Sequence, residues 1–452
     1  MLVGLGFVIW RVFALGFVSF QPELLTASDM NIATRLSILV RTVLSDINRV
    51  AFGTWLQVFT LPSGKRALLI YGGLVGLAFI TVAVYLLKFQ AEPESEGEDQ
   101  ISPAWQTTWV GLGFFALLAA GWPFWITKIP VALTFPYDRS TLAFMPGACL
   151  LAVGLIGMLR SRVVQSLLLA LLVSLSVGLH FQNANTFRKE WEVFKPFFWQ
   201  LSWRVPALQP GTILGMDNQA FDYHSDKFYA PLINWTYAPE NRSTEVSYYL
   251  IDFHKLDERY PLTDGKTVPV ATQYGSLRFE SKSDSILLIA YDPPGCLRVL
   301  SEADAYLLEI PDNLRAALDV SNLSLILMEN ETTSVPPTFL GSEPQHGWCY
   351  YYEKADLARQ QADWQQVVAL MEEAQSQGFS PHHPTEWLPL IEGYAHLGKL
   401  NSARDLSLPI AENAFFHNGI CETWSNLAEQ TEHDDANTKT IRHIQRELNC
   451  TQ

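Results

Sequence analysis

Apolar residues are concentrated in the first 181 positions, where four stretches have the length and composition of membrane-spanning helices. A helix needs about 20 mostly apolar residues to cross the ~30 Å hydrocarbon core of a bilayer. The four stretches are residues 67–87, 108–126, 142–159 and 163–181. Tryptophans and a tyrosine fall near their ends, where amphipathic rings settle at the headgroup level. The pattern predicts a multi-pass α-helical membrane domain over residues 1–181, with the lipid bilayer as a partner.

Two further segments precede the first of these spans. Residues 3–20 have the length of a span but carry Arg11 at the centre, so an interfacial segment is the alternative. Residues 31–59 place Ile32, Leu36, Leu39 and Val43 at helical spacing and are punctuated by arginines. They are predicted to form an amphipathic interfacial helix in the headgroup plane. Packing of this helix on its own membrane domain is the other interpretation.

Beyond residue 181 the pattern becomes that of a water-soluble protein. Residues 182–208 show helical spacing, and several short apolar runs follow between turns rich in Gly, Pro and Asp. We expect a soluble α/β or α+β domain over residues 182–345. The expected strands are TILGM, VSYYLIDF, SLRFES, SILLIAYD, LRVL and LSLILM.

Residues 346–452 are predicted to be helical, and two stretches there share a register. The stretch with Ala358, Ala362, Trp364 and Val367 aligns with the one holding Tyr394, Gly398, Leu400 and Ala403, at an offset of 36 residues. A small residue opening a turn and an apolar residue two places later resemble the tetratricopeptide repeat (TPR) over residues 350–430. This resemblance implies helical hairpins with a concave protein-binding surface. Ordinary helical hairpins that cap the preceding domain remain the alternative.

Charge narrows the classes of partner. Residues 182–452 carry 37 acidic and 20 basic residues, a net charge of −17, whereas the first 181 are about neutral. Such a tail is repelled by nucleic-acid phosphates, so DNA and RNA are excluded as partners. Protein, sugar or cation partners fit better. The sequence has no Gly-rich phosphate loop, CxxC pair or HExxH motif, and no cofactor is expected.

Four of the five cysteines, Cys296, Cys349, Cys421 and Cys450, lie in the tail, an even number suited to two disulfides. Sequential pairing is one of three connectivities, and four unpaired thiols are the alternative. Disulfides would place the tail in an extracytoplasmic compartment. The distribution of Lys and Arg among the membrane loops favours the opposite orientation. We expect an integral cell-membrane protein with an extracytoplasmic tail.

A polar loop after the first expected strand is the candidate binding site of the tail. Asp222, His224 and Asp226 alternate, so an extended backbone would present them on one face, with Asp217 nearby. Oxygen and imidazole groups at this spacing suit a cation or a sugar. A solvated acidic loop gives the same pattern, and no metal is assigned.

The layout of several spans, a membrane-exit helix and a Gly-Thr-apolar strand resembles the C-terminal part of membrane glycosyltransferases that use polyprenyl-phosphate sugars. That family implies an acidic catalytic residue in the first external loop, where Asp29 and Asp46 are the candidates. Neither belongs to a paired acidic motif, and five spans are fewer than that family has unless the chain is part of a longer protein.

The sequence therefore leaves two candidate functions. The first is a membrane protein that presents an acidic extracytoplasmic domain with TPR-like helices to protein partners, in envelope or surface-polysaccharide assembly. The second is a membrane glycosyltransferase, or a fragment or subunit of one, acting on a lipid-linked sugar. A third, transport, is disfavoured because Arg11 is the only charge within the expected spans and no inverted repeat is seen.

Overall fold

The structure is a computed structural model of the 452-residue chain. It describes residues 31–62, 64–88, 105–127, 129–135, 137–217, 221, 226–253, 269–274, 276–328, 333–430 and 435–450. The candidate span 3–20 and Asp29 lie outside these residues. Contacts divide the chain into two units, Met1–Arg188 and Lys189–Gln452, and the boundary falls inside one long helix, α8.

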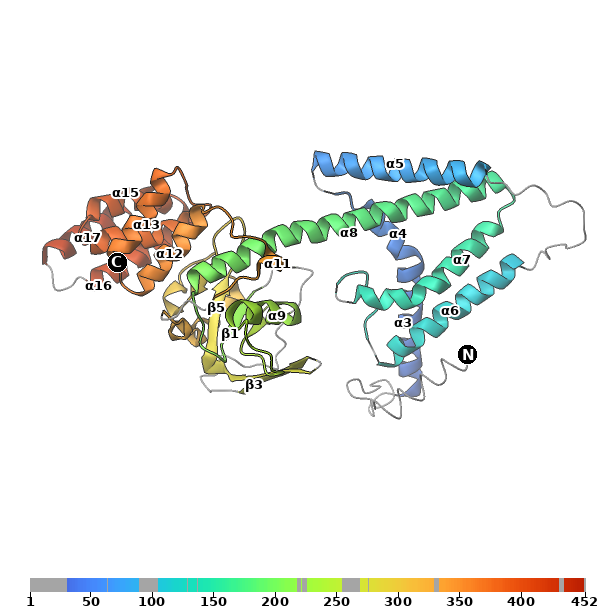
Figure 1. The fold of residues 1–452 in the computed structure, drawn as a ribbon, viewed down its shortest axis with the longest axis horizontal. Helices are drawn as coiled ribbons and strands as arrows, with labels where there is room; N and C mark the ends of the chain where they lie inside the picture. The colour runs from blue at the N-terminus through green and yellow to red at the C-terminus, as the bar shows by residue number, and fades with distance from the viewer. Residues whose placement is uncertain are drawn as a thin grey trace, which may run out of the picture. The chain divides into compact units, whose positions relative to one another are not determined.

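The described part of the first unit is helical (Figure 1). Four helical stretches, Lys65–Lys88, Trp105–Trp125, Asp138–Gly157 and Arg162–Arg204, are long and apolar enough to cross a membrane, and each overlaps one of the predicted spans. The elements are α3 (Ile32–Asn48), the π-turn η1 (Arg49–Gly53), α4 (Thr54–Leu56), η2 (Gln57–Phe59), α5 (Lys65–Lys88), α6 (Trp105–Thr127), η3 (Asp138–Phe144), α7 (Met145–Gly157) and α8 (Arg162–Arg204).

These helices turn large apolar side chains outward. On α5, Leu69 is 75% exposed and Leu77 is 64% exposed, and Phe115 on α6 is 68% exposed. A helix that is apolar on all sides and exposes such groups is suited to a lipid environment. Helix α3 packs on α6, as the second interpretation of residues 31–59 expects.

Helices α6 and α7 approach one another through glycines. A Cβ at Gly113 would lie 2.6 Å from the backbone nitrogen of Leu151, and a Cβ at Gly147 would lie 2.7 Å from that of Leu117. Both contacts are closer than real Cβ atoms allow, so only glycine fits. Small residues at such crossings let transmembrane backbones pack closely, where lipid gives little hydrophobic drive for association.

A small mixed sheet lies in the second unit. Its strand order is β2-β1-β5-β6; β1 is parallel to β2 and β5, and β6 is antiparallel to β5. Helix α9 (Asp226–Tyr237) connects β1 to β2, and β3 and β4 form a separate hairpin. The strands are β1 (Ile213–Met216), β2 (Tyr249–Asp252), β3 (Pro269–Tyr274), β4 (Leu277–Lys282), β5 (Ile286–Ala290) and β6 (Arg298–Leu300).

One of the strands predicted from the sequence, residues 323–328, does not form as a strand. LSLILM begins with the 3-10 turn η8 (Leu323–Leu325) and reaches the sheet region only through an isolated bridge between Ile326 and Leu208. Asn322 caps this turn by accepting from the backbone N–H of Ser324, which competes with strand pairing. The sequence reading also missed α9 and β3, whose apolar pattern is interrupted by prolines and polar residues.

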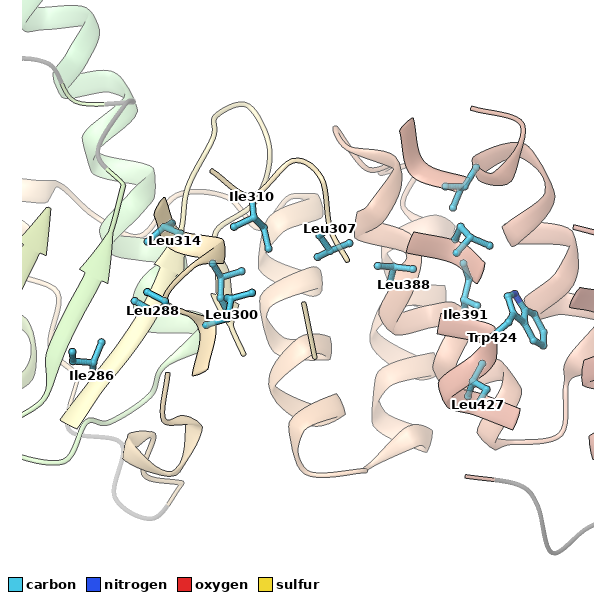
Figure 2. Close-up of a cluster of buried hydrophobic side chains, with 14 of the residues drawn as sticks. Ile286, Leu288, Leu300, Leu307, Ile310, Leu314, Leu388, Ile391, Trp424 and Leu427 are labelled. Atoms are coloured by element: carbon cyan, nitrogen blue, oxygen red, sulfur yellow. The ribbon is translucent and has the colours of Figure 1, made fainter. Parts of the chain in front are cut away.

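Alternate residues along the strands face two cores. Leu214 and Leu287 belong to an aromatic-rich core with the end of α8, where Phe194, Phe197 and Phe221 pack with ring centroids within 5.6 Å. Ile213 and the residues beside it on the other face join a second core. Figure 2 follows that core from Ile286, Leu288 and Leu300 on the sheet to Leu388, Ile391, Trp424 and Leu427 in the C-terminal helices.

The C-terminal helices (orange to red in Figure 1) follow one another in antiparallel pairs, each helix packed on the next. Helices α12 and α14 also contact each other, as do α14 and α16. The short elements before them are η5 (Ser283–Ser285), η6 (Glu302–Asp304), α10 (Asp312–Arg315), η7 (Leu318–Val320) and α11 (Pro337–Leu340). The paired helices, with the turn η9, are α12 (Trp348–Gln360), α13 (Trp364–Ser376), η9 (Pro384–Trp387), α14 (Leu388–His396), α15 (Leu400–Ala411), α16 (Ala414–Gln430) and α17 (Asp435–Glu447).

Turns of the same geometry end several helices in this region. One follows α13 at Gly378 (φ 82°), and two others follow α12 and α14. Ala362 after α12 has φ 57° and Gly398 after α14 has φ 74°, and these positions are 36 residues apart. In each turn the next backbone N–H donates to the carbonyl five residues earlier, Asp363 to Ala358 at 3.0 Å and Lys399 to Tyr394 at 2.8 Å. This is the Schellman ending of a helix, which favours glycine because of its positive φ. The small residues that aligned in the sequence therefore occupy equivalent backbone positions.

Candidate functional site

The C-terminal helix pairs are the best-formed candidate surface, and a disulfide joins them to the sheet domain. Cys296, in the loop between β5 and β6, is bonded to Cys349 on α12, with a Cα–Cα distance of 5.2 Å. Cys421 on α16 is bonded to Cys450, just after α17, at 5.3 Å. The structure thus has the sequential pairing. Cys149 on α7, by contrast, is a free, exposed cysteine.

A buried carboxylate reinforces the first disulfide. Glu386, in η9, accepts the backbone N–H of Cys296 at 2.9 Å and that of His382 at 3.0 Å. Arg298 on β6 pairs with Glu309 at 3.1 Å and also bonds Thr385, next to Glu386. Charged hydrogen bonds at buried sites are stronger than neutral ones. The loop between β5 and β6 and the segment before α14 are therefore held in fixed positions relative to each other.

A chain of alternating charges crosses from α8 to α14. Arg204, the last residue of α8, donates to Asp356 on α12 at 2.7 Å, and both side chains are almost completely buried. Arg359 contacts the same carboxylate at 2.8 Å and reaches Glu392 on α14 at 3.1 Å. Burial alone would raise the pKa of Asp356, but the two guanidinium groups hold its pKa below the ordinary value.

Glu353, one turn before Asp356, is buried without compensation. Neither of its carboxylate oxygens has a hydrogen-bond partner among the described residues, and the side chain is 0% exposed. Burial, with a smaller contribution from the neighbouring charge of Asp356, raises its pKa well above the ordinary value. Burial without a hydrogen-bond partner therefore favours the neutral, protonated form of this carboxyl, because ionisation there is costly.

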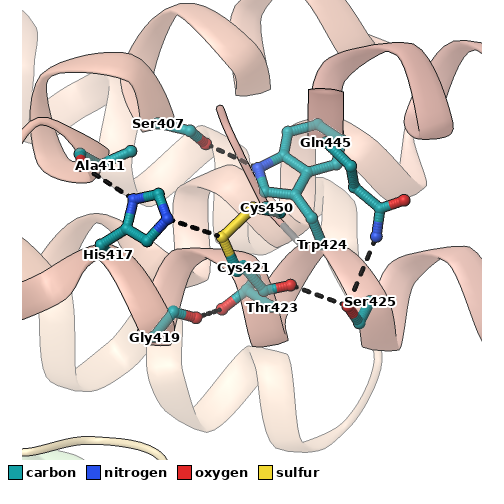
Figure 3. Close-up of a disulfide and its surroundings, with 10 residues drawn as sticks. All are labelled: Ser407, Ala411, His417, Gly419, Cys421, Thr423, Trp424, Ser425, Gln445 and Cys450. Carbon is teal, nitrogen blue, oxygen red and sulfur yellow. Dashed lines mark hydrogen bonds between the residues drawn. A yellow bond between two sulfur atoms is a disulfide. The ribbon is translucent and has the colours of Figure 1, made fainter. Parts of the chain in front are cut away.

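The second disulfide closes the far end of the helix pairs (Figure 3). His417 lies one helical turn before Cys421, with Nε2 3.6 Å from Sγ and Nδ1 3.0 Å from the carbonyl oxygen of Ala411. Trp424, fully buried, donates from Nε1 to Ser407 Oγ at 3.0 Å and so joins α16 to α15. Both ends of the helical region are thus covalently fastened.

Helices α13 and α15 carry exposed polar side chains. They include Gln365, Glu373, Asn401 and Asp405. Residues 346–452 contain 15 acidic and 7 basic residues, and within the described part Glu353, Asp356 and Glu386 are the buried ones among these acids. The remainder still has an acidic excess, which suits a basic partner.

The polar loop predicted as a binding site is only partly described by the structure. Asp217 directly follows β1 and is buried, so it is not part of a solvated loop. Asp226 is the first residue of α9, and the backbone there is helical rather than extended, so the expected alternation does not reach it. Asp222 and His224 lie outside the described residues. No group of three metal-binding side chains occurs within the described segments.

Asp252 is a residue near this site that the sequence reading missed. It ends β2 and is buried. In the parallel register it lies opposite Met216, the residue that precedes Asp217. The carboxyl ends of adjacent parallel strands meet at one sheet edge, where α/β proteins place ligands. The signal was available, because Asp252 lies near the end of the expected strand VSYYLIDF and Asp217 directly follows the expected strand TILGM.

Asp46 is the second catalytic residue suggested by the sequence, and unlike Asp29 it lies within the described residues. It lines a cavity of about 670 Å³ in the first unit. Its carboxylate pairs with Arg49 at 2.9 Å and accepts the Trp125 indole N–H at 3.0 Å. Arg49 also donates to the carbonyl of Val131 at 2.5 Å. The charged residue beside Asp46 in this cavity is therefore the cationic Arg49 rather than a second carboxylate.

No protein-family model matches the sequence, and no curated protein or solved structure matches it either.

Proposed function

We propose that this protein is a membrane-anchored, extracytoplasmic platform whose C-terminal TPR-like helix pairs bind a protein partner during envelope or surface-polysaccharide assembly. The observation that carries the proposal is the pair of equivalent turns at Ala362 and Gly398, 36 residues apart, within consecutively packed helices. Repeats of this kind form extended surfaces for protein recognition. The acidic character of the helices favours a partner with a basic surface.

The extracytoplasmic location is supported by the two tail disulfides, because such bonds persist in oxidising compartments. It can be tested in a Cys149→Ser background by labelling intact cells with a membrane-impermeant maleimide. We expect the tail cysteines to react only after mild reduction. Labelling that requires cell lysis and no reductant would place the tail in the cytoplasm and reject this part of the proposal.

Partner binding can be tested by site-specific photocrosslinking in native membranes. A crosslinker at Gln365 on α13 or Asp405 on α15 should give one discrete adduct that weakens as salt rises. The matched control is Glu280, exposed on β4 in the sheet domain. The same adducts from Glu280, or none from either helix, would contradict a dedicated surface on the helix pairs.

The second candidate function is transfer of a sugar from a polyprenyl phosphate. The buried Asp46, beside a cavity and oriented by Arg49 and Trp125, is the specific observation that favours it. A positioned carboxylate typically contributes 10²- to 10⁴-fold as a general base. Under this proposal Asp46→Asn lowers transfer from a labelled polyprenyl-phosphate sugar by about 100-fold or more. Asp138→Asn is the control, and equal activity of both variants would reject the enzyme.

A further inference from the structure

A small polar cavity in the second unit is walled by two tryptophans. Its volume is about 210 Å³, and its walls include Trp199, Ser202 and Trp203 from the last turns of α8, Thr333, Glu343 and Lys354. The two indoles are one helical turn apart, with ring centroids 6.5 Å apart and planes at 36°. Pro206 and Val335 complete the lining, so the cavity has both apolar and polar walls.

Trp203 is fixed in place before any ligand arrives. Its Nε1 donates to Glu343 Oε1 at 2.9 Å, and Tyr350 meets its ring edge-on at 5.2 Å. His346 stacks on Tyr350 with centroids 3.5 Å apart and also contacts Glu343 Oε1 at 3.1 Å. Contacts on several sides leave the ring little freedom, and such preorganisation reduces the entropy lost on binding.

The polar groups of the cavity are one cation, one carboxylate and two hydroxyls. Lys354 is half-buried on α12 and has no ion-pair partner within the described residues, and Glu343 keeps a second carboxylate oxygen beyond the one that holds Trp203. Ser202 donates to the Trp199 carbonyl at 2.7 Å, which leaves its oxygen free to accept. A ligand hydroxyl both donates and accepts, so neighbouring hydroxyls can bond to the carboxylate and the ammonium together.

A pyranose ring has the matching chemistry: one face of C–H groups for an indole wall and equatorial hydroxyls around its edge. Aromatic side chains combine apolar contact area with a fixed geometry, which suits them to this packing. Lys354 and Glu343 give the cavity one charge of each sign, so its own charged groups balance, which suits a neutral sugar.

We infer that this cavity binds a single neutral hexopyranose unit of a glycan, held between Lys354 and Glu343 against Trp199 and Trp203. The inference rests on the proposed role in polysaccharide assembly and adds the class of sugar that the platform recognises. It is independent of the protein partner and of Asp46.

The test uses the full chain in a detergent without sugar groups and saturation-transfer NMR with glucose, galactose, N-acetylglucosamine and glucuronate. We expect transfer to the ring protons of at least one neutral sugar. Binding should weaken about tenfold or more in Lys354→Met, equivalent to about 1.4 kcal/mol. Glu343→Gln, which keeps an acceptor for Trp203 but loses the charge, should weaken it similarly, whereas Lys282→Met on β4 should not change it.

The absence of transfer to every neutral sugar would overturn the inference, as would transfer that neither cavity variant reduces. Binding of glucuronate alone would overturn the neutral assignment. Near-UV circular dichroism verifies that the variants are folded. If the photocrosslinks at Gln365 persist while sugar binding is absent, this inference fails and the protein-binding proposal stands; the reverse pattern rejects only the protein-binding proposal.

Discussion

The helices of the first unit and the C-terminal helix pairs differ in which side chains they bury. In the first unit, large apolar groups such as Leu69 and Phe115 are exposed, and Asp46 is buried against an arginine. In the helix pairs, Glu353, Asp356 and Glu386 are buried, while most of the exposed side chains are polar. The first arrangement is stable where lipid replaces water around the helices; the second depends on pairing every buried charge or keeping it neutral. Helical content alone does not separate the two regions.

The largest expected effect comes from removing one charge of the buried chain. Arg204→Met leaves the carboxylate of Asp356 buried with only Arg359, and breaking a buried pair in this way costs about 3–5 kcal/mol. Arg404 on α15 is the matched control, because its ion pairs with Asp405 and Glu447 are exposed. Guanidinium unfolding of the full chain in detergent should show a large loss for Arg204→Met and no measurable change for Arg404→Met. Equal midpoints would mean that the α8-to-α12 contact does not stabilise the tail.

Opening the second disulfide should have a slightly smaller effect. The Cys421–Cys450 bond closes a loop of 29 residues, for which loop-closure entropy gives about 3–4 kcal/mol. Ser replacements at both positions should lower the unfolding midpoint of the α16–α17 region, reported by the buried Trp424. Cys149→Ser removes an exposed thiol and should leave stability unchanged. A double Ser variant as stable as the wild type would show that packing alone holds α17.

A third comparison replaces an exposed leucine by arginine in each region, the first unit and the C-terminal helix pairs. Leu77 lies in the middle of α5 and Leu408 lies on α15; both are exposed. Arg at the centre of a spanning segment costs about 2.5–3.5 kcal/mol for insertion, so Leu77→Arg should reduce insertion of residues 65–88 in a translocon reporter. Leu408→Arg should change tail stability by no more than about 0.5 kcal/mol. Unchanged insertion of the Leu77→Arg segment would argue against α5 as a span.

The two regions also differ in how well the sequence predicts them, because they differ in which side chains they bury. Apolar length alone located α5 to α8, because lipid selects on composition. Short apolar runs between turn residues located β1, β2, β4, β5 and β6. The small residues Ala362 and Gly398, which the sequence aligned, both adopt a positive φ after a helix, and the TPR-like register itself stays a prediction. The charge chain of Arg204, Asp356 and Glu392 could not be found, since its members are 36 to 188 residues apart in sequence and each alone is typical of a solvated surface. The tryptophan cavity was hidden for the same reason, as Glu343 and Lys354 are remote from Trp199.

The smallest expected effect is a difference in pH dependence between two glutamates of the helix pairs. Burial raises the pKa of Glu353 well above its ordinary value of about 4.5, so the folded state binds its proton more tightly than the unfolded state does. The stabilisation that this protonated group gives is complete below the unfolded pKa and is lost as pH rises through the folded pKa. Asp356 has the opposite sign: its lowered pKa stabilises the fold above about 3.8 and loses that contribution as pH falls.

Glu353→Gln removes the titration of Glu353 but leaves that of Asp356. The variant should therefore gain stability relative to the wild type as pH rises above the unfolded pKa of Glu353, by about 1.4 kcal/mol for each unit of pH over which the folded wild type keeps the proton and the unfolded chain has lost it. Glu422→Gln, at an exposed position on α16, should differ from the wild type by the same amount at every pH. Unfolding midpoints across this range measure both. A constant difference for Glu353→Gln would mean that the buried carboxyl does not hold its proton, and the helix pairs would then tolerate an unpaired buried charge that their other buried acids avoid through pairing.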